Sequence, residues 1–409
     1  MFFALALPFL LTVPAYCGTY SGGTGEPNNP YRIADANNMN EIGADSNDWD
    51  KHFVLVNDIN LAEYNYDTAV ICPDGNNQNW QYDETGFTGI FDGNNWSICN
   101  LHIDVNDVNN DYLGLFGCIE SGGEVKNLRI RDVNIVGANG SGDIGGLAGY
   151  NKGSITSCYV TGSVNGWDTV AGLVGDNDGL IEDCIAEVSV QGLFDSEIIA
   201  GLVGENAADI TNCYAFCNIE GKASLGGLVG YNYSAGKVTK CYAFGTIAGE
   251  HESIGVGGFV GGNAGTIENC YAQVDVCCGD SSQYIGGFAG YTYNSLAKCY
   301  AASPMSVGTS TLDTGGFAGG NNATVEDCFW DETIGGLDNG IGTALSTKKM
   351  KASISYVLAN WDFVEIWDIG ENQTYPFLRQ YPAGDLNHDG IVNFPDFAIF
   401  AKDWLIGTQ

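Results

Sequence analysis

The sequence predicts an all-β fold, a parallel β-helix in which nine or ten coils stack into a rod. A glycine-rich segment recurs about every 29 residues, each unit holds only short apolar runs, and glycine supplies 58 of the 409 residues. Repeats of ~20–50 residues made of strands and turns are typical of solenoids, because one coil cannot bury its apolar face until its neighbours stack on it. The whole chain is therefore expected to be one long solenoid with small additions at its ends.

The composition limits the class of protein and of partner. Hydrophobic residues make up 44% and aromatic residues 12%, which argues against disorder, and 9 prolines without a Gly-X-Y period exclude collagen. Lys plus Arg number 15 and Asp plus Glu number 50, so the formal net charge is −35. This charge repels phosphate backbones and anionic lipid headgroups, so we expect no nucleic-acid partner.

The first residues are typical of an export signal. Residues 1–13 are almost uninterruptedly apolar, and we interpret 1–17 as a signal peptide, with small residues at Val13 and Ala15 for one cleavage site and Cys17 for a second. A short membrane anchor is the alternative, because the usual basic residues are missing. No later run approaches the ~18–20 apolar residues of a membrane span, so we expect a secreted or cell-surface protein without an integral membrane segment after cleavage.

The repeat is most regular over seven units. Each unit begins with a segment such as GGLVGYN or AGLVGDN and reaches a cysteine, and the cysteines are 26, 29, 28, 29, 29 and 29 residues apart. These cysteines are Cys158, Cys184, Cys213, Cys241, Cys270, Cys299 and Cys328. Weaker copies lie upstream. The solenoid is predicted to span 63–330, with a cap and lead-in strands over 18–62 and a second cap over 331–380.

Side-chain parity orients the strand that follows each cysteine. In the first unit the aliphatic Val160 and Val164 share parity with Cys158, so the cysteine points into the core and Tyr159 points outward. Neighbouring rungs lie ~4.8 Å apart, more than the ~3.5–4.5 Å between Cβ atoms that a disulfide prefers, so these cysteines are predicted to be reduced. The outward positions form an aromatic column interrupted by Ile185: Tyr159, Tyr214, Tyr242, Tyr271, Tyr300 and Phe329.

Three further sets of residues qualify this picture. Asparagines recur at a turn, where a stacked amide column can satisfy backbone groups: Asn151, Asn177, Asn206, Asn232, Asn263 and Asn321. Three cysteines fall off the ladder and could pair with one another: Cys217, Cys277 and Cys278. The tyrosine column could stack the sugar rings of a glycan, although an aromatic ladder that only protects the solenoid surface is the favoured interpretation.

The pattern GGLVGYN…CYA at this spacing resembles the GLUG-repeat family of large secreted bacterial proteins, and the resemblance covers roughly Phe53–Trp330. It implies a secreted β-solenoid with a non-catalytic role. The flanking segments also look like those of such solenoids, with a short helical stretch near Ala34–Ile42 and strands over Phe53–Leu61. At the other end, Leu345–Leu358 reads as a capping helix that starts at Ser346 or Thr347, and the strands that close the rod follow over Trp361–Leu378.

The sharpest chemical motif occupies residues 385–396. It matches a twelve-residue calcium loop, in which oxygens alternate along the backbone and Gly390 permits the tight turn. The predicted ligands are the side chains of Asp385, Asn387, Asp389, Asn393 and Asp396 and the carbonyl of Ile391. The loop and the apolar helix pattern after it resemble a single dockerin type I repeat over 381–409. The resemblance implies Ca²⁺ and a cohesin-like or other surface protein as partner.

Catalytic signatures are sparse. Between Lys152 and Lys348 there is no arginine and there are only four lysines, whereas a lyase that acts on acidic sugars needs a base and cationic clamps. Acids such as Asp176 and Glu205 are interpreted as solvated turn residues. The leading hypothesis is a secreted, non-catalytic adhesion or scaffold protein. The alternative is a polysaccharide-binding or polysaccharide-degrading β-helix protein, either a lyase or a glycoside hydrolase, for which three or more acidic side chains would have to meet in one cleft.

Overall fold

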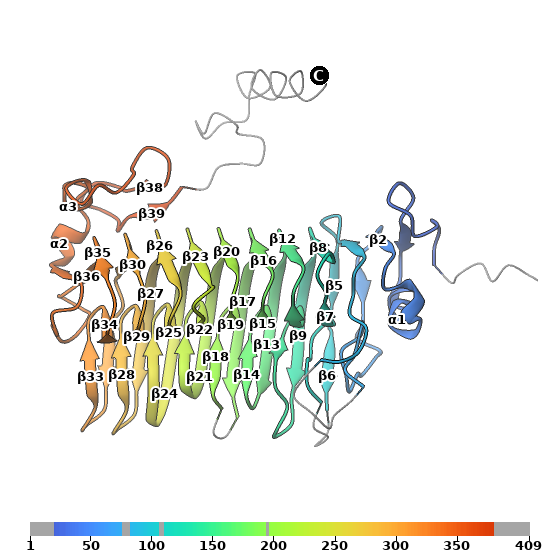
Figure 1. The fold of residues 1–409 in the computed structure, drawn as a ribbon, viewed down its shortest axis with the longest axis horizontal. Coiled ribbons are helices and arrows are strands. Elements are labelled where there is room, and N and C mark those ends of the chain that lie inside the picture. Colours follow the sequence, from blue (N-terminus) through green and yellow to red (C-terminus); the bar gives the residue numbers. More distant parts are fainter. Residues whose placement is uncertain (1–19, 76–81, 106–109, 194–195, 380–409) are drawn as a thin grey trace, which may run out of the picture.

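The computed structural model describes residues 20–75, 82–105, 110–193 and 196–379. Within these ranges the chain forms a rod of parallel strands, with helix α1 (Ala36–Ala44) at one end and the short helices α2 (Thr347–Met350) and α3 (Ile354–Val357) at the other (Figure 1). A 3₁₀ turn, Ser46–Asp48, follows α1. None of the described helices is long and apolar enough to cross a membrane. The predicted all-β parallel solenoid is confirmed.

Three parallel sheets run along the rod in the described part of the chain. The first contains β1 (Tyr31–Ile33), β2 (His52–Leu55), β4 (Ile90–Asp92), β8 (Glu124–Lys126), β12 (Ser154–Thr156), β16 (Leu180–Glu182), β20 (Asp209–Thr211), β23 (Lys237–Thr239), β26 (Thr266–Glu268), β30 (Leu296–Ala297) and β35 (Val325–Glu326). The second contains β7 (Phe116–Ile119), β11 (Ala148–Asn151), β15 (Val174–Asn177), β19 (Val203–Asn206), β22 (Val229–Asn232), β25 (Val260–Asn263), β29 (Ala289–Thr292) and β34 (Ala318–Asn321).

The third sheet holds the longest strands. It contains β3 (Ile59–Asn60), β5 (Ser97–Cys99), β6 (His102–Asp104), β9 (Arg129–Val136), β10 (Ile144–Gly145), β13 (Tyr159–Gly166), β14 (Thr169–Ala171), β17 (Ile185–Gly192), β18 (Ile198–Ala200), β21 (Tyr214–Gly226), β24 (Tyr242–Gly257), β27 (Tyr271–Cys278), β28 (Gln283–Gly286), β31 (Tyr300–Ala301), β32 (Met305–Val307), β33 (Leu312–Gly315), β36 (Phe329–Asp331) and β37 (Thr343–Leu345). A small antiparallel pair, β38 (Trp367–Asp368) and β39 (Phe377–Leu378), lies beyond it in the chain.

The rod has about eight turns, fewer than the nine or ten coils that the sequence predicts. Eight strands of the second sheet are described, and each marks one turn. The weak N-terminal repeats extend the first and third sheets through strands such as β2 and β5, but Ile71 and Phe87 reach the first turn of the second sheet only through isolated bridges, to Phe116 and Ile119. These segments therefore lengthen the rod without completing a turn.

A left-handed backbone bend precedes the cysteine of each regular unit. The residue at this bend has a φ of 50 to 54° in all seven units: Ser157, Asp183, Asn212, Lys240, Asn269, Lys298 and Asp327. Short polar side chains tolerate this conformation best, and they supply five of the seven residues. The bend turns the chain from the first sheet into the third and directs the cysteine that follows inward.

The seven ladder cysteines are buried and free, as predicted. Their thiols make polar contacts along the rod. Cys184 Sγ donates to the carbonyl of Glu182 at 3.1 Å and accepts from the backbone N–H of Cys158 at 3.4 Å, and the same pattern links Cys184 to Cys213. Burial raises the pKa of Cys158 and Cys213. A small side chain that can both donate and accept is needed here, which explains the cysteine.

The off-ladder cysteines do not pair with one another. All three are free, and they differ in environment: Cys217 and Cys278 are buried and Cys277 is exposed. Cys217 lies in register with Gly245, whereas Cys278 lies in register with Gly249, four residues farther along the same strand. This offset keeps the Cys217 and Cys278 sulfurs apart.

The predicted asparagine column is present over five turns. Each buried side chain donates from Nδ2 to the Oδ1 of the next turn at 2.7 or 2.8 Å: Asn151, Asn177, Asn206, Asn232 and Asn263 in order. Asn263 then donates to the hydroxyl of Thr292 at 3.0 Å. Asn321 lies outside this chain of bonds, because it is exposed and caps the N–H of Ala323 instead.

The C-terminal cap differs from the predicted single helix over Leu345–Leu358. Helix α2 starts at Thr347 after Ser346, as expected, but ends at Met350, and α3 is a separate turn. The carbonyl of Met350 accepts a hydrogen bond from the hydroxyl of Tyr356 at 2.8 Å. Because both side chains must reach the same apolar cluster on the rod, the chain bends between them.

Candidate functional site

The predicted calcium ligands lie outside the described residues. The loop 385–396, with Asp385, Asn387, Asp389, Ile391, Asn393 and Asp396, follows Arg379, the last residue that the structure describes. Its calcium binding therefore stays a prediction from the sequence.

The aromatic column has the predicted register but is not exposed along its whole length. Tyr214, Tyr242, Tyr271, Tyr300 and Phe329 pair in order on successive turns, and Ile185 interrupts the column before them. The cap covers one end, where Tyr271 is 4% exposed and Tyr300 0%. The prediction of an outer column is wrong for this end, because Trp361, Trp367 and Tyr356 pack onto it.

The rings of the column stack on one another. Their centroids are 4.6 Å apart for Tyr214 and Tyr242, 4.9 Å for Tyr242 and Tyr271, and 5.0 Å for Tyr271 and Tyr300, and the ring planes differ by 3 to 13°. Ring faces that stack on each other present only their edges to solvent. The column therefore supports the structural interpretation, and a groove of about 570 Å³ beside the cap is bordered by the edges of Tyr214 and Tyr242.

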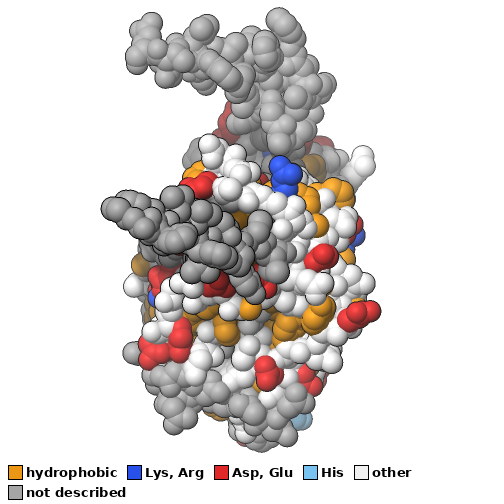
Figure 2. Space-filling model, turned by 90° about the vertical axis from the view of Figure 1, so that its right-hand side faces the viewer, with side chains coloured by type: hydrophobic (Ala, Val, Ile, Leu, Met, Phe, Trp, Pro, Cys, Tyr) orange, Lys and Arg blue, Asp and Glu red, His pale blue; other side chains and the backbone are white. Residues whose placement is uncertain are grey.

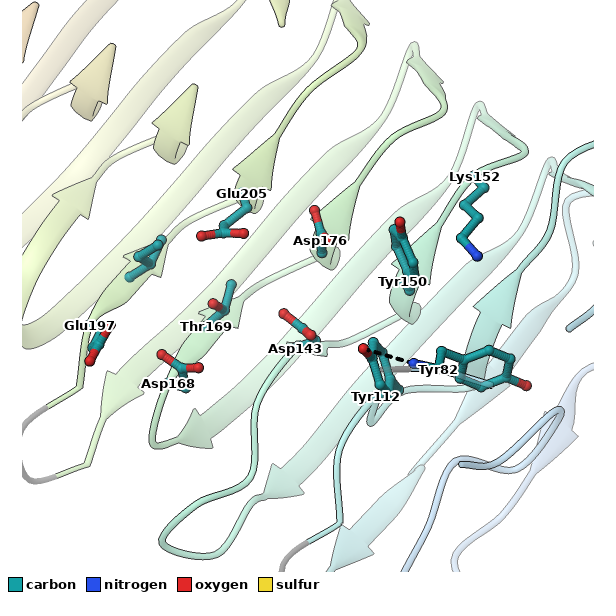
Figure 3. Close-up of a pocket in the computed structure, with 11 residues that line it drawn as sticks. Tyr82, Tyr112, Asp143, Tyr150, Lys152, Asp168, Thr169, Asp176, Glu197 and Glu205 are labelled. Atoms are coloured by element: carbon teal, nitrogen blue, oxygen red, sulfur yellow. Dashed lines mark hydrogen bonds between the residues drawn. The ribbon is translucent and has the colours of Figure 1, made fainter. Parts of the chain in front are cut away.

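A second concave site lies on another side of the rod and is rich in carboxylates. This acidic cleft has a volume of about 570 Å³ (Figure 3). Its lining residues are Tyr82, Tyr112, Asp143, Tyr150, Lys152, Asp168, Thr169, Asp176, Glu197, Ile198 and Glu205. Five of them are acids, and Lys152 is the one cation among the described residues of the lining.

The repeat itself assembles the acidic cleft. Tyr150, Asp176 and Glu205 occupy the outward position before the final asparagine of GLVGxN and pair in register on three successive turns. Asp143 lies at a left-handed corner that precedes this strand, with a φ of 53°, and projects into the same space (Figure 3). Strand spacing of ~4.8 Å brings Asp176 and Glu205 together although 29 residues separate them in the sequence.

Burial and repulsion between neighbours raise the pKa of four acids of the cleft, Asp143, Asp168, Asp176 and Glu205. Burial raises the pKa of Asp176 to about 7, and the charge of Glu205 adds to the rise. Burial, followed by repulsion from Asp176, raises the pKa of Asp143 well above its usual range. The pKa of Asp168 rises to about 6 for the same two reasons, with Glu197 as the neighbour. Near neutral pH the cleft therefore offers both hydrogen-bond donors and acceptors.

The walls of the cleft are held by hydrogen bonds and ring contacts. Lys152 Nζ lies 2.8 Å from a carboxylate oxygen of Glu120 and 4.6 Å from the ring centroid of Tyr150. The hydroxyl of Tyr150 donates to Asp178 at 2.6 Å. Tyr112 accepts from the backbone N–H of Tyr82 at 3.1 Å (Figure 3). The lysine is thus occupied by Glu120, and the free face of the cleft is dominated by carboxyl and phenol groups.

The sequence-based interpretation of Asp176 and Glu205 as solvated turn acids is wrong. Both side chains are only partly exposed, and burial is the largest cause of the raised pKa of each. The sequence feature that could have predicted the cleft is the variable residue of GLVGxN, which is Tyr, Asp and Glu in consecutive units. Aligning the units by this position would have shown the cluster.

Another acidic group lies near the N-terminal end of the rod. Among the described residues, Asp74, Asp83 and Glu84 form the group of three whose oxygens lie within 4.8 Å of one another. Glu84 shares a hydrogen bond with Asp74, and burial raises the pKa of Glu84 to about 6. Figure 2, which looks onto this end, shows several acidic and few basic side chains. The excess of acidic side chains on this surface agrees with the negative net charge of the sequence.

The fold and the repeat define a class of protein. Three segments of the chain, residues 140–165, 221–248 and 252–276, match the family model of the GLUG motif. The chain is therefore a parallel β-solenoid that carries GLUG motifs, as the sequence resemblance implied.

Two curated proteins are similar to parts of the chain. Halomucin from Haloquadratum walsbyi is 32% identical over 151 residues, which is 36% of this chain and 2% of halomucin. A protein of Evansella cellulosilytica, provisionally named as a Gly-rich membrane protein, is 42% identical over 77 residues, which is 17% of this chain and 9% of that protein. The chain thus spans less than a tenth of the length of each of these relatives.

Two solved structures are also similar. A crystal structure provisionally described as an immunoglobulin A1 protease from Bacteroides ovatus is 19% identical, and the match covers 88% of this chain and 95% of that one. A structure named IgA1 protease is 16% identical over 88% of this chain and 26% of that one. The TM-score is 0.47 in both cases, so neither likeness indicates a function.

Proposed function

We propose that this protein is an extracellular or surface-attached scaffold that binds a neutral glycan in the acidic cleft. The observation that carries the proposal is the convergence of tyrosines and partly buried carboxyl groups from successive turns in one cleft. Sugar hydroxyls both donate and accept hydrogen bonds, and carboxyl groups near their pKa can match them. The apolar segment 1–17 and the GLUG motifs support an extracellular location.

The glycan is assigned to the cleft and not to the tyrosine column. Sugar rings pack on the faces of aromatic rings, and the faces in the column are already occupied by neighbouring rings. The five acids would repel a glycan that carries carboxylate or sulfate groups. A neutral polysaccharide is therefore the favoured class of ligand.

Glycan degradation is a second candidate function, and the same acids favour it. Asp176 and Glu205 lie side by side on neighbouring turns, and burial raises the pKa of both carboxyl groups, which suits a pair that acts as acid and base in glycoside hydrolysis. Five acids meet in this cleft, which fulfils the condition set for a polysaccharide-degrading protein. We favour binding because Asp176 and Glu205 project from neighbouring turns of one sheet, whereas the two carboxyl groups of a glycoside hydrolase flank the scissile bond.

Asp176→Asn should weaken glycan binding and stabilise the protein at high pH. Loss of a hydrogen bond to a charged group corresponds to about tenfold in affinity. An unfolded aspartate ionises near pH ~4, whereas burial raises the pKa of Asp176 to about 7. The folded chain therefore loses stability as pH rises through this interval, and the variant avoids the loss. Calorimetric binding to a panel of neutral oligosaccharides and melting curves above and below neutral pH measure both effects.

Asp209→Asn is the matched control, because Asp209 is an exposed acid of β20 outside the cleft. It should leave both the affinity and the pH dependence unchanged. Reducing-end release by the native protein, lost in both Asp176→Asn and Glu205→Gln, would favour degradation over binding. Unchanged affinity and unchanged pH dependence in Asp176→Asn would refute the assignment of the cleft.

We also propose that the segment 381–409 binds Ca²⁺ and attaches the protein to a cohesin-like or other surface partner. The support is the alternation of oxygen-bearing residues over 385–396, which suits a hard cation. Calcium titration of the full chain should give a heat of binding that disappears in the double variant Asp385→Ala, Asp389→Ala. Asp176→Asn is the control: it should keep the heat of calcium binding, because that heat is expected from the loop and not from the cleft. An equal heat from the native chain and the double variant would contradict this prediction.

A further inference from the structure

Two rows of side chains continue beyond the acidic cleft along the rod. The first row is the outward position of the second sheet, where each residue pairs with the next on successive turns: Tyr150, Asp176, Glu205, Tyr231, Gly262, Tyr291 and Gly320. The second row is the corner just before that sheet: Tyr112, Asp143, Thr169, Ile198, Ser224, Gly255, Tyr284 and Asp313. In both rows the acids of the cleft are followed by tyrosines and glycines, and the second row ends in Asp313.

Glycines in these rows make room for tyrosine rings to lie across the sheet. A Cβ at Gly262 would lie 2.6 Å from Cζ of Tyr291 and 2.7 Å from the ring of Tyr231. A Cβ at Gly320 would lie 2.8 Å from the ring of Tyr284. Since a Cβ in a strand points away from the sheet, these short distances place the Tyr291 and Tyr284 side chains over the glycines on the outer side of the sheet.

The tyrosine rings of these two rows are arranged differently from those of the aromatic column. The tyrosine platform comprises Tyr231, Tyr233, Tyr284, Tyr291 and Tyr293, and its neighbouring ring planes meet at 52 to 66°. The rings therefore do not stack face to face, and Tyr293 is 57% exposed. Tyr284 has a φ of 59°, a left-handed conformation that it shares with Asp143, Ser224 and Asp313 at the same corner of other turns.

The platform is joined to the acidic cleft. Tyr233 Oη donates to a carboxylate oxygen of Glu205 at 2.9 Å, so the last acid of the cleft contacts the first tyrosines of the platform. Tyr150 and Tyr291 are five turns apart, which gives a track of about 24 Å along the rod. A ligand that fills the cleft can therefore extend over the platform without leaving the sheet.

We infer that the platform is an extended binding surface for a linear, neutral polysaccharide, with the sugar chain parallel to the rod axis. This inference rests on the proposed glycan-binding function of the cleft and adds the polymeric nature of the ligand. The exposed Tyr233 and Tyr293 rings suit the apolar faces of sugar rings, and the tyrosine hydroxyls suit the sugar hydroxyls. The acids of the cleft repel anionic polymers.

The test compares short and long neutral oligosaccharides on the full chain. Cello-, malto-, xylo- and manno-oligosaccharides, each as a disaccharide and a hexasaccharide, are titrated by calorimetry. The native protein should bind one hexasaccharide more tightly than its disaccharide. Tyr291→Ala should reduce hexasaccharide affinity about tenfold and leave disaccharide affinity unchanged, since only the longer ligand reaches the platform.

Two further variants keep the test independent of folding. In Gly262→Ala the new methyl meets only side chains, the distal end of Tyr291 and the ring of Tyr231, and not backbone. Both rings must shift on the surface, so the fold should persist and only hexasaccharide affinity should fall. Phe216→Ala removes an aromatic side chain that is 41% exposed in the third sheet and should change neither affinity.

The outcomes separate this inference from the proposed function. Equal affinity for both ligand lengths, unaffected by Tyr291→Ala, overturns the platform and leaves glycan binding by the cleft intact. Binding of none of these oligosaccharides overturns both. Preference for polygalacturonate over the neutral series, or capture of an aromatic-rich peptide in their place, overturns the assigned class of ligand.

Discussion

Trp367→Ala should lower the free energy of unfolding of the C-terminal cap by about 3–5 kcal/mol, the usual cost of truncating a buried tryptophan. Trp367 is fully buried, and its ring centroid lies 4.5 Å from that of Trp361 and 6.0 Å from that of Tyr271. Its Nε1 donates to Asn269 at 3.2 Å, so the variant also leaves a buried amide oxygen without this donor. Urea denaturation followed by fluorescence measures the loss.

The same variant should release the cap from the aromatic column. Tyr271 and Tyr300 would then face water, so binding of a hydrophobic dye should rise and proteolysis should begin within 346–378. Trp96→Ala provides the matched control, because Trp96 is 38% exposed and its loss should cost less than ~0.5 kcal/mol. Similar destabilisation by the two tryptophan variants would show that the cap does not depend on this contact.

Asn206→Leu should destabilise the rod by about 2–5 kcal/mol. Asn206 accepts from Asn177 and donates to Asn232, both at 2.8 Å, and it also donates to the carbonyl of Ala208 at 2.9 Å. Leucine fills a similar volume but removes all three of these bonds, so that Asn177 Nδ2 keeps only the carbonyl of Gly179, at 2.9 Å. Since bonds to both neighbouring turns are lost at once, the free energy of unfolding should fall by more than the contribution of a single hydrogen bond. Chemical denaturation measures this change.

The control is the same substitution at the end of the column. Asn321 is exposed and bonds only within its own turn, to the N–H of Ala323, so Asn321→Leu should cost less than ~1 kcal/mol. Equal melting temperatures for the two leucine variants would mean that the buried amide column contributes nothing to stability.

The sequence was sufficient for features that repeat with the chain. The spacing of the ladder cysteines predicts one coil per unit, and parity correctly turns Cys158 inward and Tyr159 outward. The asparagine column follows from the same logic as far as Asn263, but the prediction also included Asn321, which lies outside the column beyond Thr292. Each of these features depends only on neighbouring turns that carry nearly the same sequence.

Features that depend on distant segments escaped sequence analysis. The hydroxyl of Tyr300 donates to the carbonyl of Pro376, 76 residues away, and no periodicity indicates that the cap folds back over the column. The acidic cleft was missed for another reason, since Asp176 and Glu205 look like isolated turn acids until the register places them side by side. Repeats reveal what every turn shares, whereas binding sites arise where successive turns differ.

The ladder cysteines also affect how the chain folds. In an unfolded chain, neighbouring ladder cysteines such as Cys213 and Cys241 are separated by fewer than thirty residues, a loop that a disulfide closes at modest entropic cost. In the rod their Cβ atoms stand at strand spacing, which a disulfide does not fit. Such a cross-link would block the stacking of the two turns that it joins. In an oxidising compartment, folding therefore competes with disulfide formation. Stacking buries the cysteine of a turn and protects it from oxidation, so the cysteine of the last turn to stack is exposed to oxidation for the longest time.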